Sequence, residues 1–190
     1  MGNDVGNTVG MSTNNQPALL VVDVQQGFDD AGYWGPRNNP DCEANIGKLL
    51  EHWREQDRPV VFIRHDSTEE HSPLRPDHPG NQFKPVVTGD PDVLISKHTN
   101  SCFYGDPDLH RWLQDRRIKT LVLCGITTNH CCETTARMAG NLGYDVRFVL
   151  DATHTFDRGD LTADQLAHAT ATNLKDEFAT IVTTEEITRN

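Results

Sequence analysis

The chain has 190 residues, of which 28 are acidic and 17 are basic, so its formal net charge is −11. This length suits a single domain with a substantial core. The acidic balance and the lack of a basic run argue against a nucleic-acid partner or an anionic membrane surface, and no apolar stretch is long enough to span a bilayer.

The cysteines and the N-terminal segment point to a cellular compartment and a domain boundary. The five cysteines are odd in number, irregularly spaced and preceded by no secretory segment, which predicts reduced thiols in a cytoplasmic protein. Residues 1–16 are rich in Asn, Gly and Thr without periodicity. We therefore expect a flexible N-terminal tail at 1–16, followed by one domain at 17–190.

Six short apolar runs predict β-strands. Most are continuous and β-branched, which is typical of a parallel sheet covered on both faces. In chain order the runs are Ala18–Val24, Pro59–Ile63, Val93–Ile95, Thr120–Cys124, Val146–Leu150 and Ala179–Val182.

Helical segments alternate with these strands. Residues 45–56 place Ile46, Leu49, Leu50 and Trp53 on one face. Asp106-Pro107 predicts a cap followed by proline at the first helical position, and residues 129–142 and 161–175 complete the set. The alternation predicts an α/β fold, namely a doubly wound, mainly parallel six-stranded sheet with helices on both faces. The long irregular stretch 65–90 is expected to be an active-site or interface loop.

Polar residues follow several of the predicted strands, where ligands bind in such folds. Asp23 lies within the first apolar run, Lys97 follows the third, and a turn at Gly125 leads from the fourth to Cys131 and Cys132. An aspartate in an apolar strand is costly unless it is paired or used. A purely structural ion pair with Lys97 is the simpler interpretation. The functional one joins a cysteine nucleophile, Asp23 as its base and Lys97 as a positive charge.

A thiol at a strand-to-helix turn lies near amide N–H groups and a helix dipole, which favour the thiolate. A nearby Lys97 would lower the thiol pKa further. The turn alone does not decide whether Cys131 or Cys132 is the nucleophile. Either thiol could instead be a buried structural cysteine.

Metal and nucleotide cofactors are not expected. Nine histidines are present, but no HExxH or CxxC pair occurs, and loop histidines such as His65, His71 and His78 are more often solvated than ligating. Neither GxGxxG nor GxxxxGK[ST] appears, which argues against dinucleotide and P-loop sites.

Three motifs together resemble the isochorismatase-like cysteine hydrolase superfamily: 19–28 (LLVVDVQQGF), Ser96-Lys97 and 125–131 (GITTNHC). They occur in the family order, and the resemblance covers nearly the whole chain from residue 17. It implies a catalytic triad of Asp23, Lys97 and Cys131, with Cys132 a packing residue. It also implies a cis peptide between Ile126 and Thr127, with the amides of Thr127 and Cys131 forming an oxyanion hole.

The implied activity is hydrolysis of a C–N bond through a thioester. Nicotinamidases of the family carry an Asp-Trp-His-x-x-x-His type metal motif after the second strand, where this chain has 64–68 (RHDST). Segments 29–40 and 64–67 look more like the branch that contains streptothricin hydrolase. That enzyme opens the lactam of a cationic antibiotic, which would agree with an acidic protein.

The expected partner is a small amide or lactam substrate. Its binding residues, each of which could equally belong to the core or an interface, are expected to be Phe28, Tyr33, Trp34, Asn100, Phe103 and His130. The resemblance also implies a homodimer or higher homo-oligomer. The alternatives are a nicotinamidase or other small-amide or ureide hydrolase and, from a different class, a non-catalytic thiol-redox or binding protein that uses Cys131-Cys132.

Overall fold

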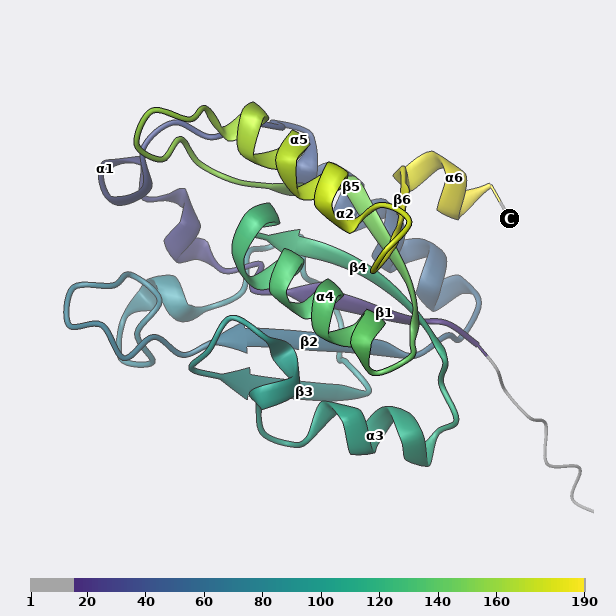
Figure 1. The fold of residues 1–190 in the computed structure, drawn as a ribbon. Coiled ribbons are helices and arrows are strands. Elements are labelled where there is room, and N and C mark those ends of the chain that lie inside the picture. Colours follow the sequence, from purple (N-terminus) through teal and green to yellow (C-terminus); the bar gives the residue numbers. More distant parts are fainter. Residues whose placement is uncertain (1–15, 190) are drawn as a thin grey trace, which may run out of the picture.

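The computed structural model describes residues 16–189, so the tail predicted for 1–16 lies, except for Gln16, outside the described residues. Six parallel strands form one sheet in the order β3-β2-β1-β4-β5-β6 (Figure 1). Their bounds are β1 (Ala18–Val22), β2 (Val60–His65), β3 (Val93–Lys97), β4 (Thr120–Ile126), β5 (Asp145–His154) and β6 (Thr180–Val182).

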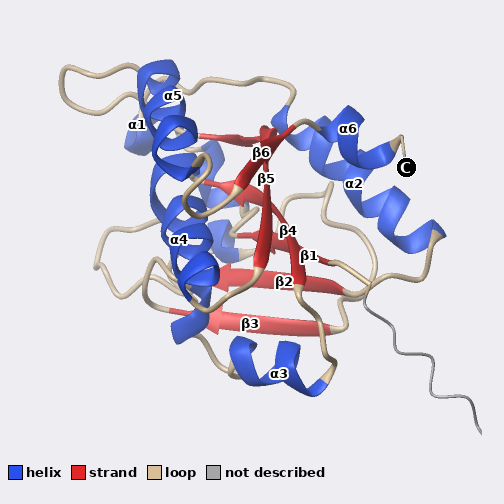
Figure 2. Cartoon of the chain, turned by 45° about the vertical axis from the view of Figure 1, so that its right-hand side comes forward, coloured by secondary structure: helices blue, strands red, loops and turns tan. Residues whose placement is uncertain are grey.

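Helices cover both faces of the sheet (Figure 2). One face packs on α2 (Cys42–Glu55) and α6 (Thr184–Thr188), and the other on α3 (Leu109–Asp115), α4 (Glu133–Asn141) and α5 (Ala163–Leu174). Successive residues of β1 enter opposite cores, since Leu20 belongs to the α3/α4 side and Leu19 to the α2 side. The predicted doubly wound α/β class is therefore confirmed.

The sheet has its switch point between β1 and β4. From β1 the chain passes to β2 and β3 on one side, and later from β4 to β5 and β6 on the other. The carboxyl ends of these two central strands border the crevice where such folds bind ligands. The long segment 65–90 lies beside this end: Gln25 bridges to Phe83, and Leu74 and Asn81 are buried. Among the described residues, no helix is long and apolar enough to cross a bilayer.

Several predicted element boundaries were wrong. The first strand, predicted to run to Val24, ends at Val22, so that Asp23 follows the strand instead of lying within it. Asp106 does not cap a helix, because its N–H and C=O both pair with Ser96; Pro107 follows it through a cis peptide, and the cap of α3 is Asp108, whose side chain accepts from the Arg111 N–H at 3.0 Å. The strand predicted to end at Leu150 continues to His154. A register shift between Leu123 and Gly125 lets the two strands stay paired over this polar extension.

Some shorter elements had no clear signal in the sequence. These are α1 (Ala31–Trp34), α6, and the 3-10 turns η1 (Gln26–Asp29), η2 (Pro79–Asn81) and η3 (Cys102–Tyr104). The helix predicted at 129–142 starts with a π-helical turn, η4 (Thr128–Cys132), before α4.

Gly125 lets β4 pass close to β1 at the switch point. Its φ is +131°, and a Cβ at this position would lie 2.0 Å from the carbonyl oxygen of Val22. Any other residue would push the end of β4 away from β1. The glycine therefore fixes the spacing of the two strand ends that carry Asp23 and the turn to Cys131.

We expect Gly125→Ala to lower the free energy of unfolding by about 2–4 kcal/mol, because a backbone strain and a steric clash add at one position. Gly143→Ala is a matched control, since φ there is also positive (+85°) but nothing lies within 4 Å of an added Cβ; its cost should be about 1 kcal/mol. Urea unfolding of both variants makes the comparison. Equal losses would contradict the role of the close approach.

Candidate active site

The three residues predicted as a catalytic triad lie together at the switch point. Asp23 follows β1, Lys97 is the last residue of β3, and Cys131 lies in η4 after β4. The Lys97 Nζ is 2.7 Å from Asp23 Oδ2 and 3.3 Å from Cys131 Sγ. The side chains of Asp23 and Lys97 are both fully buried. Their catalytic roles remain a prediction, but the proximity on which those roles depend is present.

Asp23 presents one free carboxylate oxygen to this cluster. Its backbone is left-handed, with φ +51°, and its N–H bonds to the carbonyl of Ile63. Oδ2 accepts from Lys97, whereas Oδ1 is buried and has no hydrogen-bond partner among the described residues. The carboxylate lies within 4.8 Å of Cys131 Sγ. A buried acceptor without a donor is a suitable place for the thiol proton.

Lys97 supplies the positive charge of the cluster. Besides Asp23 and Cys131, its Nζ is 3.0 Å from the carbonyl oxygen of Thr99 and 3.1 Å from His65 Nδ1. Burial alone would lower the pKa of Lys97, but the adjacent Asp23 carboxylate raises it above its ordinary value. The side chain is therefore a permanent ammonium whose three protons are shared among four acceptors.

His65 is part of the cluster, although the sequence placed it only in a loop of solvated histidines. It is the last residue of β2, between the strands that carry Asp23 and Lys97. Burial, and then the Lys97 charge, lowers its pKa, so the ring is neutral near pH 7. Because the ammonium only donates, Nδ1 is the acceptor and Nε2 carries the proton.

The expectation that the turn favours a thiolate at Cys131 was wrong. Burial, and then the Asp23 carboxylate, raises the pKa of Cys131 well above its usual value, and these effects outweigh the lowering by Lys97. The thiol is thus neutral at rest, and it donates to Asn100 Oδ1 at 3.6 Å. Cys132 is completely buried and packs in the core.

The peptide between Ile126 and Thr127 is cis, as the resemblance implied. The same turn continues into η4, where the N–H of Cys132 donates to the Thr127 carbonyl at 3.2 Å. The oxyanion-hole role of the Thr127 and Cys131 amides remains a prediction.

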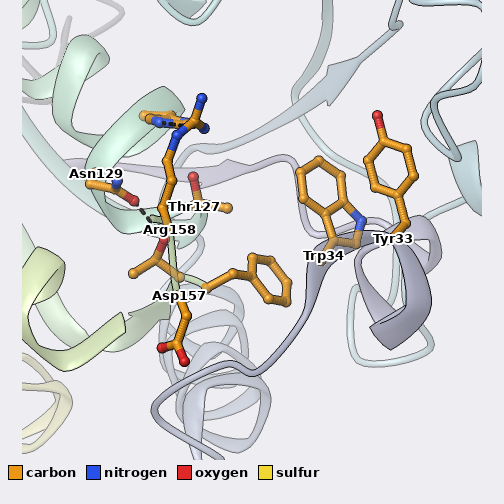
Figure 3. Close-up of a pocket in the computed structure, with 9 residues that line it drawn as sticks. Tyr33, Trp34, Thr127, Asn129, Asp157 and Arg158 are labelled. Carbon is orange, nitrogen blue, oxygen red and sulfur yellow. Dashed lines mark hydrogen bonds between the residues drawn. The ribbon is translucent and has the colours of Figure 1, made fainter. Parts of the chain in front are cut away.

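Two adjoining cavities open at this end of the sheet. The inner cavity, about 90 Å³, has Cys131, His65 and Asn100 in its wall. The outer cavity, about 360 Å³, has Tyr33, Phe156 and Arg158 in its wall (Figure 3). Both are lined by Trp34, Thr127 and His130.

Most of the predicted substrate-binding residues line these cavities. The inner cavity is lined by Phe28, Trp34, Asn100 and His130, and Tyr33 lines the outer cavity. Phe103 lines neither: it is buried, and its ring stacks on Tyr144 with centroids 5.9 Å apart.

The segment 155–158 was not predicted to belong to the site, yet it forms much of the wall of the outer cavity. Residues that directly follow a strand were the candidates for the site, but the fifth strand was predicted to end at Leu150 and in fact ends at His154. The residues after His154 were therefore not among the candidates. Phe156 stacks on Trp34 with centroids 5.4 Å apart, so this segment and α1 make one aromatic wall.

The three potential metal ligands in the cluster do not suit a metal ion. Asp23, His65 and Cys131 offer ligand atoms within 4.8 Å of one another. However, Lys97 Nζ lies 2.7, 3.1 and 3.3 Å from those same side chains. A zinc ion bound at about 2.0–2.3 Å from each ligand would lie against the ammonium. The Lys97 ammonium thus takes the place that a metal ion would occupy.

The doubly wound sheet and the acid, ammonium and thiol at its switch point define an α/β protein with a cysteine-centred site. The family model of the isochorismatase domain matches residues 17–186. The chain therefore belongs to the isochorismatase family of hydrolases.

Its relatives support the assignment. The isochorismatase family protein YrdC of Bacillus subtilis (strain 168) is 44% identical over 90% of this chain and 93% of that protein. A crystal structure of an isochorismatase-family protein from Chromobacterium violaceum is 38% identical, with a TM-score of 0.86 over 92% of this chain and 93% of that one. Nicotinamidase 3 of Arabidopsis thaliana is 32% identical over 91% of this chain and 87% of that protein.

Alkylation tests the neutral thiol. Because the pKa of Cys131 is raised, we expect iodoacetamide to modify it slowly at pH 7, with a rate that rises about tenfold per pH unit above that. Lys97→Met removes the charge that lowers this pKa and should slow the reaction further. Tandem mass spectrometry separates Cys131 from Cys132. Fast alkylation of Cys131 that does not change with pH would show a resting thiolate instead.

Elemental analysis tests the exclusion of metal. We expect the purified protein to hold no stoichiometric zinc, because the Lys97 ammonium neutralises the three potential ligands. Lys97→Ala leaves those ligands in place without the ammonium and should bind zinc more tightly than the parent in a competition titration. Stoichiometric zinc in the parent, lost together with activity on chelation, would overturn this interpretation.

Proposed function

We propose that this protein is a metal-independent cysteine amidohydrolase that cleaves the C–N bond of a small amide or lactam through a thioester. One observation carries the proposal: the free Asp23 Oδ1 is buried beside a neutral Cys131 thiol, with Lys97 bonded to both residues. A base, a nucleophile and a fixed charge at these positions are the parts that acyl transfer requires. The 32% identity to a nicotinamidase supports amide chemistry.

In the first half-reaction Asp23 takes the proton of Cys131, and the sulfur attacks the amide carbonyl carbon. The tetrahedral oxyanion is stabilised by the amides of Thr127 and Cys131. Collapse breaks the C–N bond as protonated Asp23 gives its proton to the leaving nitrogen. An amine or ammonia departs from an ordinary amide, whereas a lactam nitrogen stays attached to the opened acyl chain.

In the second half-reaction Asp23 accepts a proton from water, which attacks the thioester carbonyl. The carboxylic acid product leaves, and the proton returns to the Cys131 sulfur. Throughout both halves Lys97 stays an ammonium, so it stabilises the thiolate or the carboxylate, whichever is charged.

Streptothricin-type lactam opening is the specific reaction that the sequence resemblance favours, and the net charge of −11 suits its cationic substrate. Nicotinamide and ureides are the alternatives. The cytoplasmic location and the homo-oligomeric state of the protein stay predictions.

Substitution of the reacting groups tests the proposal. On a panel of amides, ureides and lactams, Cys131→Ala should abolish turnover, and Asp23→Asn should lower kcat about 10²–10⁴-fold, because it removes the base. Cys132→Ala is the matched control and should keep most of the activity. Mass spectrometry of acid-quenched enzyme should find the acyl group on Cys131. Equal losses in the two cysteine variants, with folding intact, would contradict the assignment.

A further inference from the structure

The outer cavity is placed to hold the part of a substrate that does not react. It shares Trp34, Thr127 and His130 with the inner cavity, which contains Cys131. An amide bound at the sulfur would therefore extend its substituent into the outer cavity. The stacked rings of Trp34 and Phe156 give that substituent an apolar wall.

Arg158 is a cation at this cavity without a carboxylate partner among the described residues. The residue is solvent-exposed, and its Nη1 donates to His130 Nε2 at 3.4 Å. Arg37, in contrast, is bonded through both terminal nitrogens to Glu43. A guanidinium that has no acid partner and lines a pocket is suited to an anionic ligand, which it can bind through two parallel hydrogen bonds.

The adjacent Asp157 and His130 do not cancel this charge. Asp157 points away from the Arg158 guanidinium (Figure 3) and instead accepts from the Ala163 N–H at 2.7 Å, at the start of α5. His130 carries no negative charge, and since Arg158 only donates, His130 Nε2 accepts and Nδ1 holds the proton. The neutral ring therefore presents a donor rather than a second acceptor.

The acidic net charge of the whole protein does not decide which charge of ligand the outer cavity binds. The net charge of −11 is a sum over the whole chain, and at physiological ionic strength charges beyond about 8 Å are largely screened. A ligand in the outer cavity responds mainly to the guanidinium in its wall.

We propose that the outer cavity is a carboxylate subsite, and that the substrates of this enzyme are small amides carrying a carboxylate a few atoms from the scissile carbonyl, held by Arg158. The inference rests on the proposed amidohydrolase function and narrows its substrate class. It favours an anionic amide over the cationic lactam.

Three amides of similar shape and different charge test it: succinamate, succinamide and β-alaninamide, which end in a carboxylate, a neutral amide and an ammonium. Ammonia release should give a kcat/KM for succinamate about 10–100-fold above that for succinamide, the range expected for a charged hydrogen-bonded contact. The difference should appear mainly in KM. β-Alaninamide should be the poorest of the three. Equal rates, or a preference for the ammonium, would overturn the proposal.

Variants at Arg158 tie the preference to one side chain. Arg158→Gln should bring the succinamate-to-succinamide ratio close to one, and Arg158→Lys should keep part of it. Arg111→Gln is the matched control: it removes the same charge from an exposed arginine that lines neither cavity, and the ratio should not change. An unchanged ratio in Arg158→Gln would show that another group selects the substrate.

A binding measurement separates this inference from the proposed function. If no amide of the set is turned over, the amidohydrolase proposal or its substrate range fails, while calorimetry with succinate on the Cys131→Ala variant still examines the subsite. Binding that is at least tenfold weaker when Arg158→Gln is added supports the carboxylate subsite. No detectable succinate binding, or binding independent of Arg158, overturns it.

Discussion

The buried ion pair between Asp23 and Lys97 is the interaction on which the rest of the site depends. Both side chains are fully removed from solvent, at 2.7 Å from each other. Removing one partner of such a pair leaves an uncompensated buried charge, at a cost of about 3–5 kcal/mol. The pair also spans the end of β2, since β1 and β3 are separated by that strand in the sheet. This explains why His65, at the end of β2, contacts the Lys97 ammonium, whose charge helps to lower the pKa of the imidazole.

The same pair accounts for the protonation state of Cys131, the proposed nucleophile. The cluster holds one cation and one anion, so a resting thiolate at Cys131 would add a second buried anion, which burial and the Asp23 carboxylate both oppose. Moving the thiol proton to Asp23 is different, because it exchanges one anion for another beside the same ammonium. The net charge of the buried cluster stays constant during this step. A low thiol pKa is therefore unnecessary: the site needs an acceptor within reach, and Asp23 Oδ1 is one.

The sequence predicted the sheet and its switch-point residues well because those features depend on local patterns. Apolar runs gave all six strands, and the residues at and after their ends gave Asp23, Lys97 and the pair Cys131-Cys132, of which only the family resemblance selected Cys131. The predictions that were wrong concern features that depend on tertiary contacts. The end of β5 is polar, and its pairing to β4 relies on a register shift that no periodicity records. Asp106 looked like a cap, but it was already paired to Ser96. The charge state of Cys131 reversed because burial, which the sequence does not measure, outweighed the lysine.

The origin of each group separates the chemistry from the choice of substrate. The residues proposed to react extend from strand ends whose spacing is fixed by the ladder and by the close approach at Gly125. The outer wall comes instead from α1, from the turn into η4 and from the segment after β5, which lies beyond the parallel ladder and is held by isolated antiparallel contacts such as that between Arg37 and Phe156. Similarity to a nicotinamidase over 91% of this chain therefore bears mainly on the reacting centre. In the proposed enzyme the substituent of the amide would lie against loop residues, so the charge at Arg158 is a better guide to it than the family name.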